Sequence, residues 1–252
     1  MTRPTVHVSL ACWPGLRHDQ AARHLASDVV EPLFGRLCTD HVQLVPQNFG
    51  VLTEAMVDGL MAAFPQVRFR LHANVRVLPE HHLADLSGYP AHREWFRQAA
   101  RISRRLAAPA YTAHAGARRD ATMAEMLDHT RRCADLFGCV VGVEGQYPIA
   151  GDAWLVSTWP EYRQLFESGV PYAIDLSHLH ILACHGGVHD DALVRDMLAC
   201  ERCIEVHVSA NDGRGDWHQV CEQPPWWWPL LQYINPKAVV FSEGNHRRKR
   251  TP

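Results

Sequence analysis

Imidazole and carboxylate side chains recur along this sequence at the ends of short apolar runs. Six successive runs end in such a residue: His72, His114, Glu144, Asp175, His207 and Glu243. Further donors follow two of these runs, with His178 close behind Asp175 and with Asp216 and His218 beyond His207. Imidazole and carboxylate groups are the donors that bind Zn, Mn, Fe and Co in proteins. The sequence therefore predicts a metal centre assembled at one edge of a sheet.

The composition fits this chemistry and argues against several other classes of protein. The 252-residue chain has 17 histidines, whereas Lys237 and Lys249 are its two lysines, so a lysine Schiff base is nearly excluded. A formal net charge of −2 gives no general attraction to nucleic acid or acidic membranes. No run approaches the ~20 apolar residues of a membrane span, and no secretory signal opens the sequence. We expect a cytoplasmic enzyme with a small-molecule substrate and without nucleic-acid or membrane partners.

The elements that must position these donors alternate along the whole sequence. Eight apolar runs are predicted strands, at residues 6–13, 41–48, 67–77, 110–115, 140–146, 172–177, 204–210 and 238–242. Six amphipathic segments are predicted helices, at residues 19–37, 53–64, 91–107, 122–137, 158–167 and 190–200. The alternation predicts an α/β fold, a single TIM-type (β/α) barrel. In such barrels the active site lies at the carboxyl ends of the strands, where these donors stand.

Local signals mark the ends of two predicted helices. Thr122 with Glu125 forms one capping box, and the pair at 158 and 161 forms another. Gly138 and Gly169 stand where the same helices should end. These signals support helices at 122–137 and 158–167.

The end of the sequence departs from an ideal barrel. After the eighth predicted strand ten residues remain, 243–252, too few for an eighth outer helix. We assign residues 1–246 to the catalytic barrel and the basic residues 247–252 to a solvated tail. Because the seam between the last and first strands lacks its helix, a homodimer is a further expectation.

The pattern resembles the xylose isomerase-like TIM barrel superfamily, which includes the AP endonuclease family 2 proteins such as endonuclease IV and many sugar isomerases and epimerases. Three short motifs carry the resemblance: HAG at His114, DLSH at 175–178, and HVSAND at His207 followed by GDWH. Glu144 and Glu243 stand where the superfamily places its strand-five and strand-eight glutamates. By strand order, the resemblance covers nearly the whole chain.

The resemblance implies ligands for one to three divalent ions per chain, which would be Zn, Mn, Fe or Co. Nine residues would hold them in three sets: His72, His114 and a bridging Glu144; Asp175, His207 and Glu243; and His178, Asp216 and His218. Glu144 and Glu243 would also be the catalytic pair. This set specifies the site more closely than the reaction, because one barrel hosts many chemistries.

Departures from endonuclease IV argue against a DNA substrate. That enzyme has DNA-wedging residues soon after its strand-three histidine, where this chain has Val75 and Arg76. Its Glu-Asn-Thr becomes Glu144, Gly145 and Gln146, and the segment after its strand-seven histidine is shortened to residues 213–215.

Three other residues are candidate substrate contacts. Arg118 follows the HAG motif and Arg214 lies in NDGRGD, and either guanidinium fits a phosphate or carboxylate through two hydrogen bonds. Trp13, at the end of the first predicted strand, would form an apolar wall. The tryptophans at 226–228 fit packing of a short helix, with a substrate lid as the alternative.

Three reactions suit the predicted centre. The leading hypothesis is an isomerase or epimerase of a sugar, sugar phosphate or related hydroxy-carbonyl compound, acting through a metal-stabilised enediolate. The second is a multinuclear phosphoester hydrolase of the endonuclease IV kind. The third is a multinuclear non-haem iron oxidase. A binding module without catalysis is the remaining alternative, and it predicts no stoichiometric metal.

Overall fold

Eight parallel strands form a nearly closed barrel in the computed structural model, which describes residues 4–80 and 83–247. The strands are β1 (Val6–Ser9), β4 (Cys38–Leu44), β5 (Arg68–Leu71), β6 (Ala110–His114), β7 (Val140–Glu144), β8 (Tyr172–Asp175), β9 (Cys203–Val208) and β10 (Val239–Ser242). Their order around the sheet is β5-β4-β1-β10-β9-β8-β7-β6. The first strand, β1, pairs with the last strand, β10. The predicted barrel and all eight predicted strands are confirmed.

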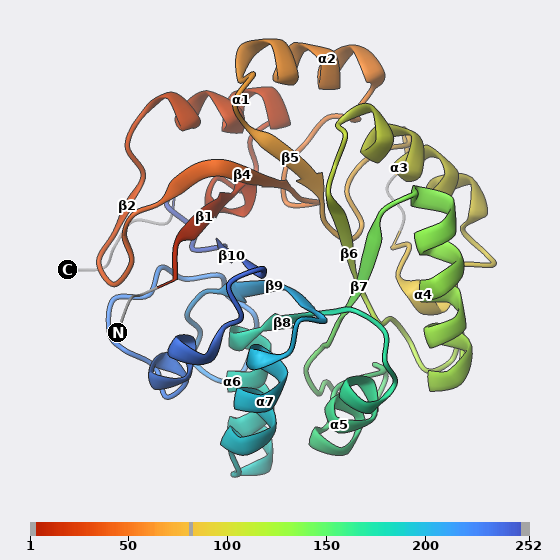
Figure 1. The fold of residues 1–252 in the computed structure, drawn as a ribbon, viewed down its shortest axis with the longest axis vertical. Coiled ribbons are helices and arrows are strands. Elements are labelled where there is room, and N and C mark those ends of the chain that lie inside the picture. The colour runs from red at the N-terminus through yellow and green to blue at the C-terminus, as the bar shows by residue number, and fades with distance from the viewer. Residues whose placement is uncertain (1–3, 81–82, 248–252) are drawn as a thin grey trace.

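Helices surround the strands, as Figure 1 shows. They are α1 (His18–Ala22), α2 (Glu54–Ala63), α3 (Arg93–Arg105), α4 (Met123–Phe137), α5 (Trp159–Glu167), α6 (Leu176–Gly186) and α7 (Asp191–Ala199). The short 3-10 helix η4 (Trp228–Tyr233) lies between β9 and β10. Within the described residues no helix follows β10, as predicted. Residues 248–252 of the predicted tail lie outside the described part, so that domain boundary stays a prediction.

The predicted helix at residues 19–37 is wrong. Here α1 is followed by the 3-10 helix η2 (Arg23–Ala26) and an antiparallel hairpin, β2 (Val30–Glu31) with β3 (Gly35–Arg36). Pro32 has no N–H for a helical bond, and Gly35 has a φ of 72°, which ends helical geometry. The apolar spacing resembled a helix, but the turn residues override it.

Most strands end earlier than predicted: the third predicted strand, 67–77, stops at Leu71 of β5, and two other ends have a clear local cause. The first strand stops at Ser9, whose side chain accepts a hydrogen bond from the Ala11 N–H and caps the 3-10 helix η1 (Leu10–Cys12). The sixth strand stops at Asp175, whose carboxylate accepts bonds from the N–H groups of Ser177 and His178 and so begins α6. The sequence analysis did not predict α6, because the helix begins directly after the strand, within the DLSH motif.

The helix caps of α4 agree with the sequence, and those of α5 agree in part. Thr122 and Glu125 form the predicted capping box, and Gly138 ends α4 with a φ of 70°. Gly169 follows α5 with a φ of 80°. The predicted box at the start of α5 is incomplete, because the Thr158 side chain bonds the Glu161 carboxylate and caps no backbone N–H.

Polar side chains fill the middle of the barrel. Glu205 of β9 pairs with Arg70 of β5 at 3.1 Å and accepts a 3.1 Å hydrogen bond from Gln43 of β4. Thr112 of β6 donates to the same carboxylate at 3.4 Å. All four residues are buried, and because they come from four strands they meet inside the barrel. We call this set the middle level. Between the strands and the outer helices the core is apolar.

None of the helices in the described residues is both long and apolar enough to cross a membrane.

Candidate metal centre

The predicted donors gather at the carboxyl ends of the strands. Seven of them form three overlapping groups, and within each group one donor atom from every residue lies within 4.8 Å of the others. The groups are His72, His114 and Glu144; His72, His207 and Glu243; and Glu144, Asp175 and His178. We call these seven residues the rim cluster. The first group contains the residues that the resemblance assigns to one ion. The other two groups differ from the sets that the resemblance implies. His72, not Asp175, lies with His207 and Glu243, and Asp175 lies with Glu144 and His178.

Glu144 lies at the centre of the rim cluster, at the end of β7. Its Oε1 lies 3.2 Å from Nδ1 of His207 and 3.8 Å from Nδ1 of His178. Its Oε2 lies 3.3 Å from Nε2 of His72 and 3.9 Å from Nε2 of His114. A carboxylate that faces four imidazoles has the position of a bridging ligand, since each oxygen faces a separate pair of donors.

Asp216 and His218 come from the loop after β9 and contact the same cluster. Asp216 lies between two imidazoles, with Oδ2 at 2.9 Å from Nε2 of His218 and 3.4 Å from Nε2 of His178. Nδ1 of His218 lies 3.4 Å from Glu243. In the third set that the resemblance implies, Asp216 therefore contacts both other members, His178 and His218. Its binding of an ion stays a proposal, as it does for the other donors.

Burial and charge act in opposite directions on these side chains. Burial would lower the pKa of His207, but the carboxylate of Glu144 raises it well above its usual range. Burial would also lower the pKa of His178, but Asp175 and its neighbours raise it to about 10. The pKa of His72 falls to about 4, because burial outweighs the attraction of Glu144. The carboxylates of the cluster therefore favour the protonated form of His207 and His178, whereas burial favours the neutral form of His72.

Two carboxylate oxygens of the rim cluster have no hydrogen-bond partner although they are buried. They are Oε2 of Glu144 and Oε1 of Glu243. An unbonded buried carboxylate oxygen is costly, and most buried polar groups are paired. Both oxygens stand beside imidazoles that are themselves metal ligands by type. The donors present therefore fit a divalent cation, which would bind these free oxygens.

Further residues hold the imidazoles in place, and the sequence reading missed them. His72 Nδ1 lies 3.1 Å from Thr112 Oγ1, and His114 Nδ1 lies 3.3 Å from Asp85 Oδ1. Glu205 Oε2 lies 3.2 Å from Nε2 of His207. Such contacts fix the orientation of metal-binding imidazoles. Glu205 precedes His207 by two residues and so shares its face of β9, a signal that the sequence contains. Asp85 lies in a loop without any such pattern.

Close backbone packing fixes the position of Glu144. The next residue, Gly145, lies against the ring of Tyr162, and any Cβ there would overlap it. The Tyr162 hydroxyl donates to the carbonyl of Gln146 at 2.9 Å. Nδ1 of His178 lies 2.9 Å from the Gly145 carbonyl oxygen. The glycine that departs from endonuclease IV thus lets α5 approach the end of β7.

The predicted substrate contacts lie in three different settings. Arg118 lies in the loop after β6 and forms ion pairs with Glu161 and Asp152. Arg214 is exposed in the loop after β9. The Trp13 ring is buried and stacks on His24 at 4.7 Å. Substrate contact by all three stays a proposal. The tryptophans at 226–228 pack at the start of η4, where Trp227 is fully buried.

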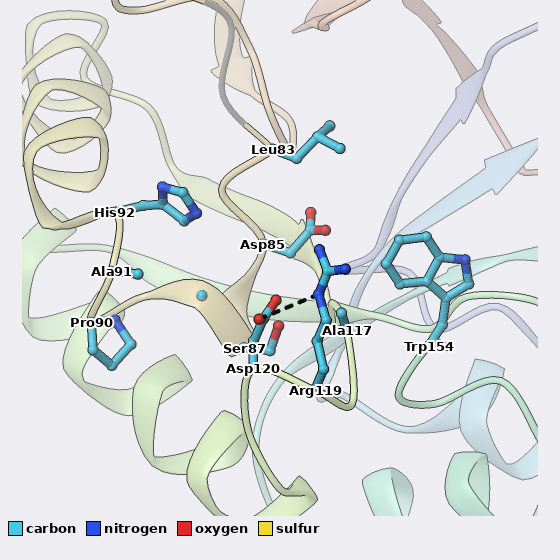
Figure 2. Close-up of a pocket in the computed structure, with 11 residues that line it drawn as sticks. Leu83, Asp85, Ser87, Pro90, Ala91, His92, Ala117, Arg119, Asp120 and Trp154 are labelled. Carbon is cyan, nitrogen blue, oxygen red and sulfur yellow. Dashed lines mark ion pairs between the residues drawn. The ribbon is translucent and has the colours of Figure 1, made fainter. Parts of the chain in front are cut away.

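A cavity of about 410 Å³, drawn in Figure 2, is lined by Asp85 and its neighbours but by none of the seven rim-cluster residues. Its walls come from the loops after β5, β6 and β7, and include Asp85, Arg119 and Trp154. Asp85 connects the cavity with the rim cluster, because it lines the cavity and its carboxylate contacts His114. Arg119 pairs with Asp120 at 3.6 Å along one side of the cavity. The cavity has space for a small polar molecule, and the Asp85 carboxylate links its wall to His114.

Solved structures with a similar fold are xylose isomerase-like TIM barrels. A D-tagatose 3-epimerase-like protein is 15% identical with a TM-score of 0.64, and the match covers 97% of this chain and 92% of that chain. An AP endonuclease, family 2, from Brucella melitensis is 15% identical with a TM-score of 0.67, over 98% and 95%. IolI, in a structure with a bound zinc atom, is 12% identical with a TM-score of 0.61, over 95% and 88%.

No protein-family model and no curated protein matches the chain. The identities with the solved structures are low, so these likenesses concern the fold. They extend over nearly the full length of both partners in each pair. The structural neighbours are xylose isomerase-like TIM barrel proteins, and this chain has their fold.

Proposed function

We propose that the protein is a metal-dependent isomerase or epimerase of a sugar, a sugar phosphate or a related small hydroxy-carbonyl compound. The observation that carries this proposal is the pair of free carboxylate oxygens, on Glu144 and Glu243, within one cluster of imidazoles. Epimerases of small sugars among the structural neighbours support it as analogy. The 410 Å³ cavity, whose wall includes Asp85, the partner of His114, has the size of a small-molecule site.

The two glutamates would move the proton. Burial would raise the pKa of Glu144, but the imidazoles of His207 and His72 hold it well below its usual range. Burial would also raise the pKa of Glu243, and His207 and His218 lower it. Both groups are therefore ionised and can accept a proton from a carbon next to a carbonyl. They stand on β7 and just after β10, which two strands separate, so they would reach a bound substrate from different sides.

The rim histidines would hold the cation that this reaction needs. A bound divalent ion supplies Lewis-acid stabilisation of the charge that develops on the substrate oxygens. His72, His207 and Glu243 form one donor group, and Glu144 joins it through His72. Burial of the cluster excludes water, which strengthens each electrostatic contact.

A phosphoester hydrolase with several ions is the second candidate, and one observation favours it. The donors form three overlapping groups, more than a reaction with a single ion requires. The family 2 AP endonuclease among the neighbours supports this candidate as analogy. Val75 and Arg76 still argue against a DNA substrate, because a wedge into the base stack needs an exposed apolar or aromatic side chain, whereas Val75 is fully buried and Arg76 is charged.

The deciding experiment measures proton exchange and metal content on the same protein. Purified protein loaded with Mn, Co or Zn is incubated in heavy water with ketoses and ketose phosphates, and deuterium at the carbon next to the carbonyl is followed by NMR. We expect exchange that stops in Glu144→Gln and Glu243→Gln and continues in Glu54→Gln, a control on α2 whose side chain is 45% exposed. Cleavage of a phosphodiester without exchange would favour the hydrolase. Iron as the bound metal, with oxygen consumption, would favour the oxidase.

A further inference from the structure

A second group of metal-binding residues lies apart from the rim cluster, where the barrel has no eighth helix. Cys12 follows β1, Glu31 lies in β2, and His246 follows β10. One donor atom from each lies within 4.8 Å of the others. Cys12 and Glu31 are fully buried, and the His246 side chain is 18% exposed. We call this group the seam cluster.

The contacts of the seam cluster leave one oxygen unused. His246 Nε2 lies 3.0 Å from Glu31 Oε1, and the Ser242 hydroxyl donates to the same oxygen at 2.6 Å. The other oxygen, Oε2, is buried and has no hydrogen-bond partner. The Cys12 thiol donates weakly to the Ser242 carbonyl at 3.4 Å. A buried carboxylate with a free oxygen beside a thiol and an imidazole has the same feature that marks the rim cluster.

We propose that Cys12, Glu31 and His246 form a second site, for a single zinc-like cation that stabilises the fold. Thiolate sulfur, imidazole nitrogen and carboxylate oxygen are all zinc ligands, and three of them leave one position for water. On binding, the Cys12 thiol releases its proton to solvent and no redox change occurs. The partial exposure of His246 gives the ion a path of entry.

The position of the seam cluster indicates what the ion would do. Its three ligands come from segments that are far apart in sequence and meet beside the β1–β10 pair. The backbone already joins two of these segments, since the His246 N–H donates to the Cys12 carbonyl at 2.8 Å. Ser242, which bonds Glu31, directly precedes Glu243 of the rim cluster. A cation here would hold the last strand, and therefore Glu243, in register with the first.

Cobalt distinguishes the two sites, because only the seam cluster contains a thiol. The protein is stripped with a chelator and titrated with Co²⁺, while the thiolate-to-cobalt charge-transfer band in the near ultraviolet is recorded. We expect one such band per chain in the wild type. It should persist in His207→Ala, which damages the rim cluster, and vanish in Cys12→Ser. It should also persist in Cys184→Ser, which removes an exposed thiol.

Two outcomes would overturn the proposal: no charge-transfer band in the wild type, or a band that survives Cys12→Ser. If Cys12→Ser does not fold, His246→Gln takes its place, because that side chain is nearer the surface. In His246→Gln we expect the cobalt affinity, measured from the charge-transfer band, to fall at least tenfold. An unchanged affinity there would equally refute the site. Circular dichroism of each variant checks that the barrel is intact.

Discussion

Buried carboxylates occur at two levels inside this barrel, and their surroundings differ. Glu205, in the middle level, has both oxygens paired, one with Arg70 and the other with Gln43, Thr112 and His207. In the rim cluster, Glu144 and Glu243 each keep one buried oxygen without a hydrogen bond. A carboxylate that the chain satisfies by itself contributes to folding. One that the chain leaves unsatisfied is a candidate ligand for a cation.

His207 connects the two levels. Its Nδ1 lies 3.2 Å from Glu144 in the rim cluster, and its Nε2 lies 3.2 Å from Glu205 in the middle level. The middle level thus fixes which nitrogen of His207 faces the rim. Substitutions in the rim cluster should therefore affect function, whereas substitutions in the middle level should affect stability.

Replacing His207 by alanine should have the largest effect on function. It removes a proposed ligand that also contacts Glu144, and we expect a loss of about a thousandfold or more in kcat/KM together with loss of bound metal. Glu243→Gln should reduce turnover similarly. Activity assays, elemental analysis and circular dichroism check this. A variant that kept full activity and full metal content would show that the rim cluster is not the active site.

Breaking the middle level should instead affect stability. In Glu205→Gln the Arg70 guanidinium stays buried without its counter-charge, and we expect a loss of about 3–5 kcal/mol in the free energy of unfolding. Urea denaturation measures it. The double variant Arg70→Met with Glu205→Leu should recover much of this loss. Arg195→Met, which breaks the exposed pair with Asp196, is the control and should change stability by less than about 1 kcal/mol. Equal losses in both single variants would remove the distinction between buried and exposed pairs.

Metal affinity should rise with pH. The carboxylates around His178 raise its pKa to about 10, so below that pH the imidazole carries a proton that an incoming cation must displace. Each proton released makes the apparent affinity about tenfold greater per pH unit. Calorimetric titrations at pH 6, 7 and 8, in two buffers with different ionisation enthalpies, count the protons. An affinity that is constant over this range would mean that the imidazoles are already neutral.

Arg214→Ala should have the smallest effect. If this exposed guanidinium binds a phosphate, we expect KM for a phosphorylated substrate to rise about tenfold or less, with little change for the neutral sugar. Arg36→Ala, which alters a distant exposed arginine, is the control. A KM that increases equally for both substrates would point to a change in the loop and not to phosphate binding.

The sequence predicted the barrel and the donor positions because both depend on patterns along the chain. Strand alternation places His72, Glu144 and Glu243 at the same edge whatever their rotamers. Which donors share an ion depends on side-chain direction across different strands, so the pairing of His72 with His207 could not be inferred. Asp85 was missed because it lies in a loop after β5 and contacts His114 on another strand, β6. The hairpin in residues 30–36 was missed because turn residues outweigh apolar spacing.

The complete pairing of Glu205 also bears on how the proposed cation would be acquired in the cell. Because the chain itself pairs this buried carboxylate, folding of the barrel interior would not have to wait for an ion. Loading would then be a late, exchangeable step at a preformed rim. The metal that a given cell installs would follow its intracellular supply, since mixed imidazole–carboxylate donors accept several first-row ions.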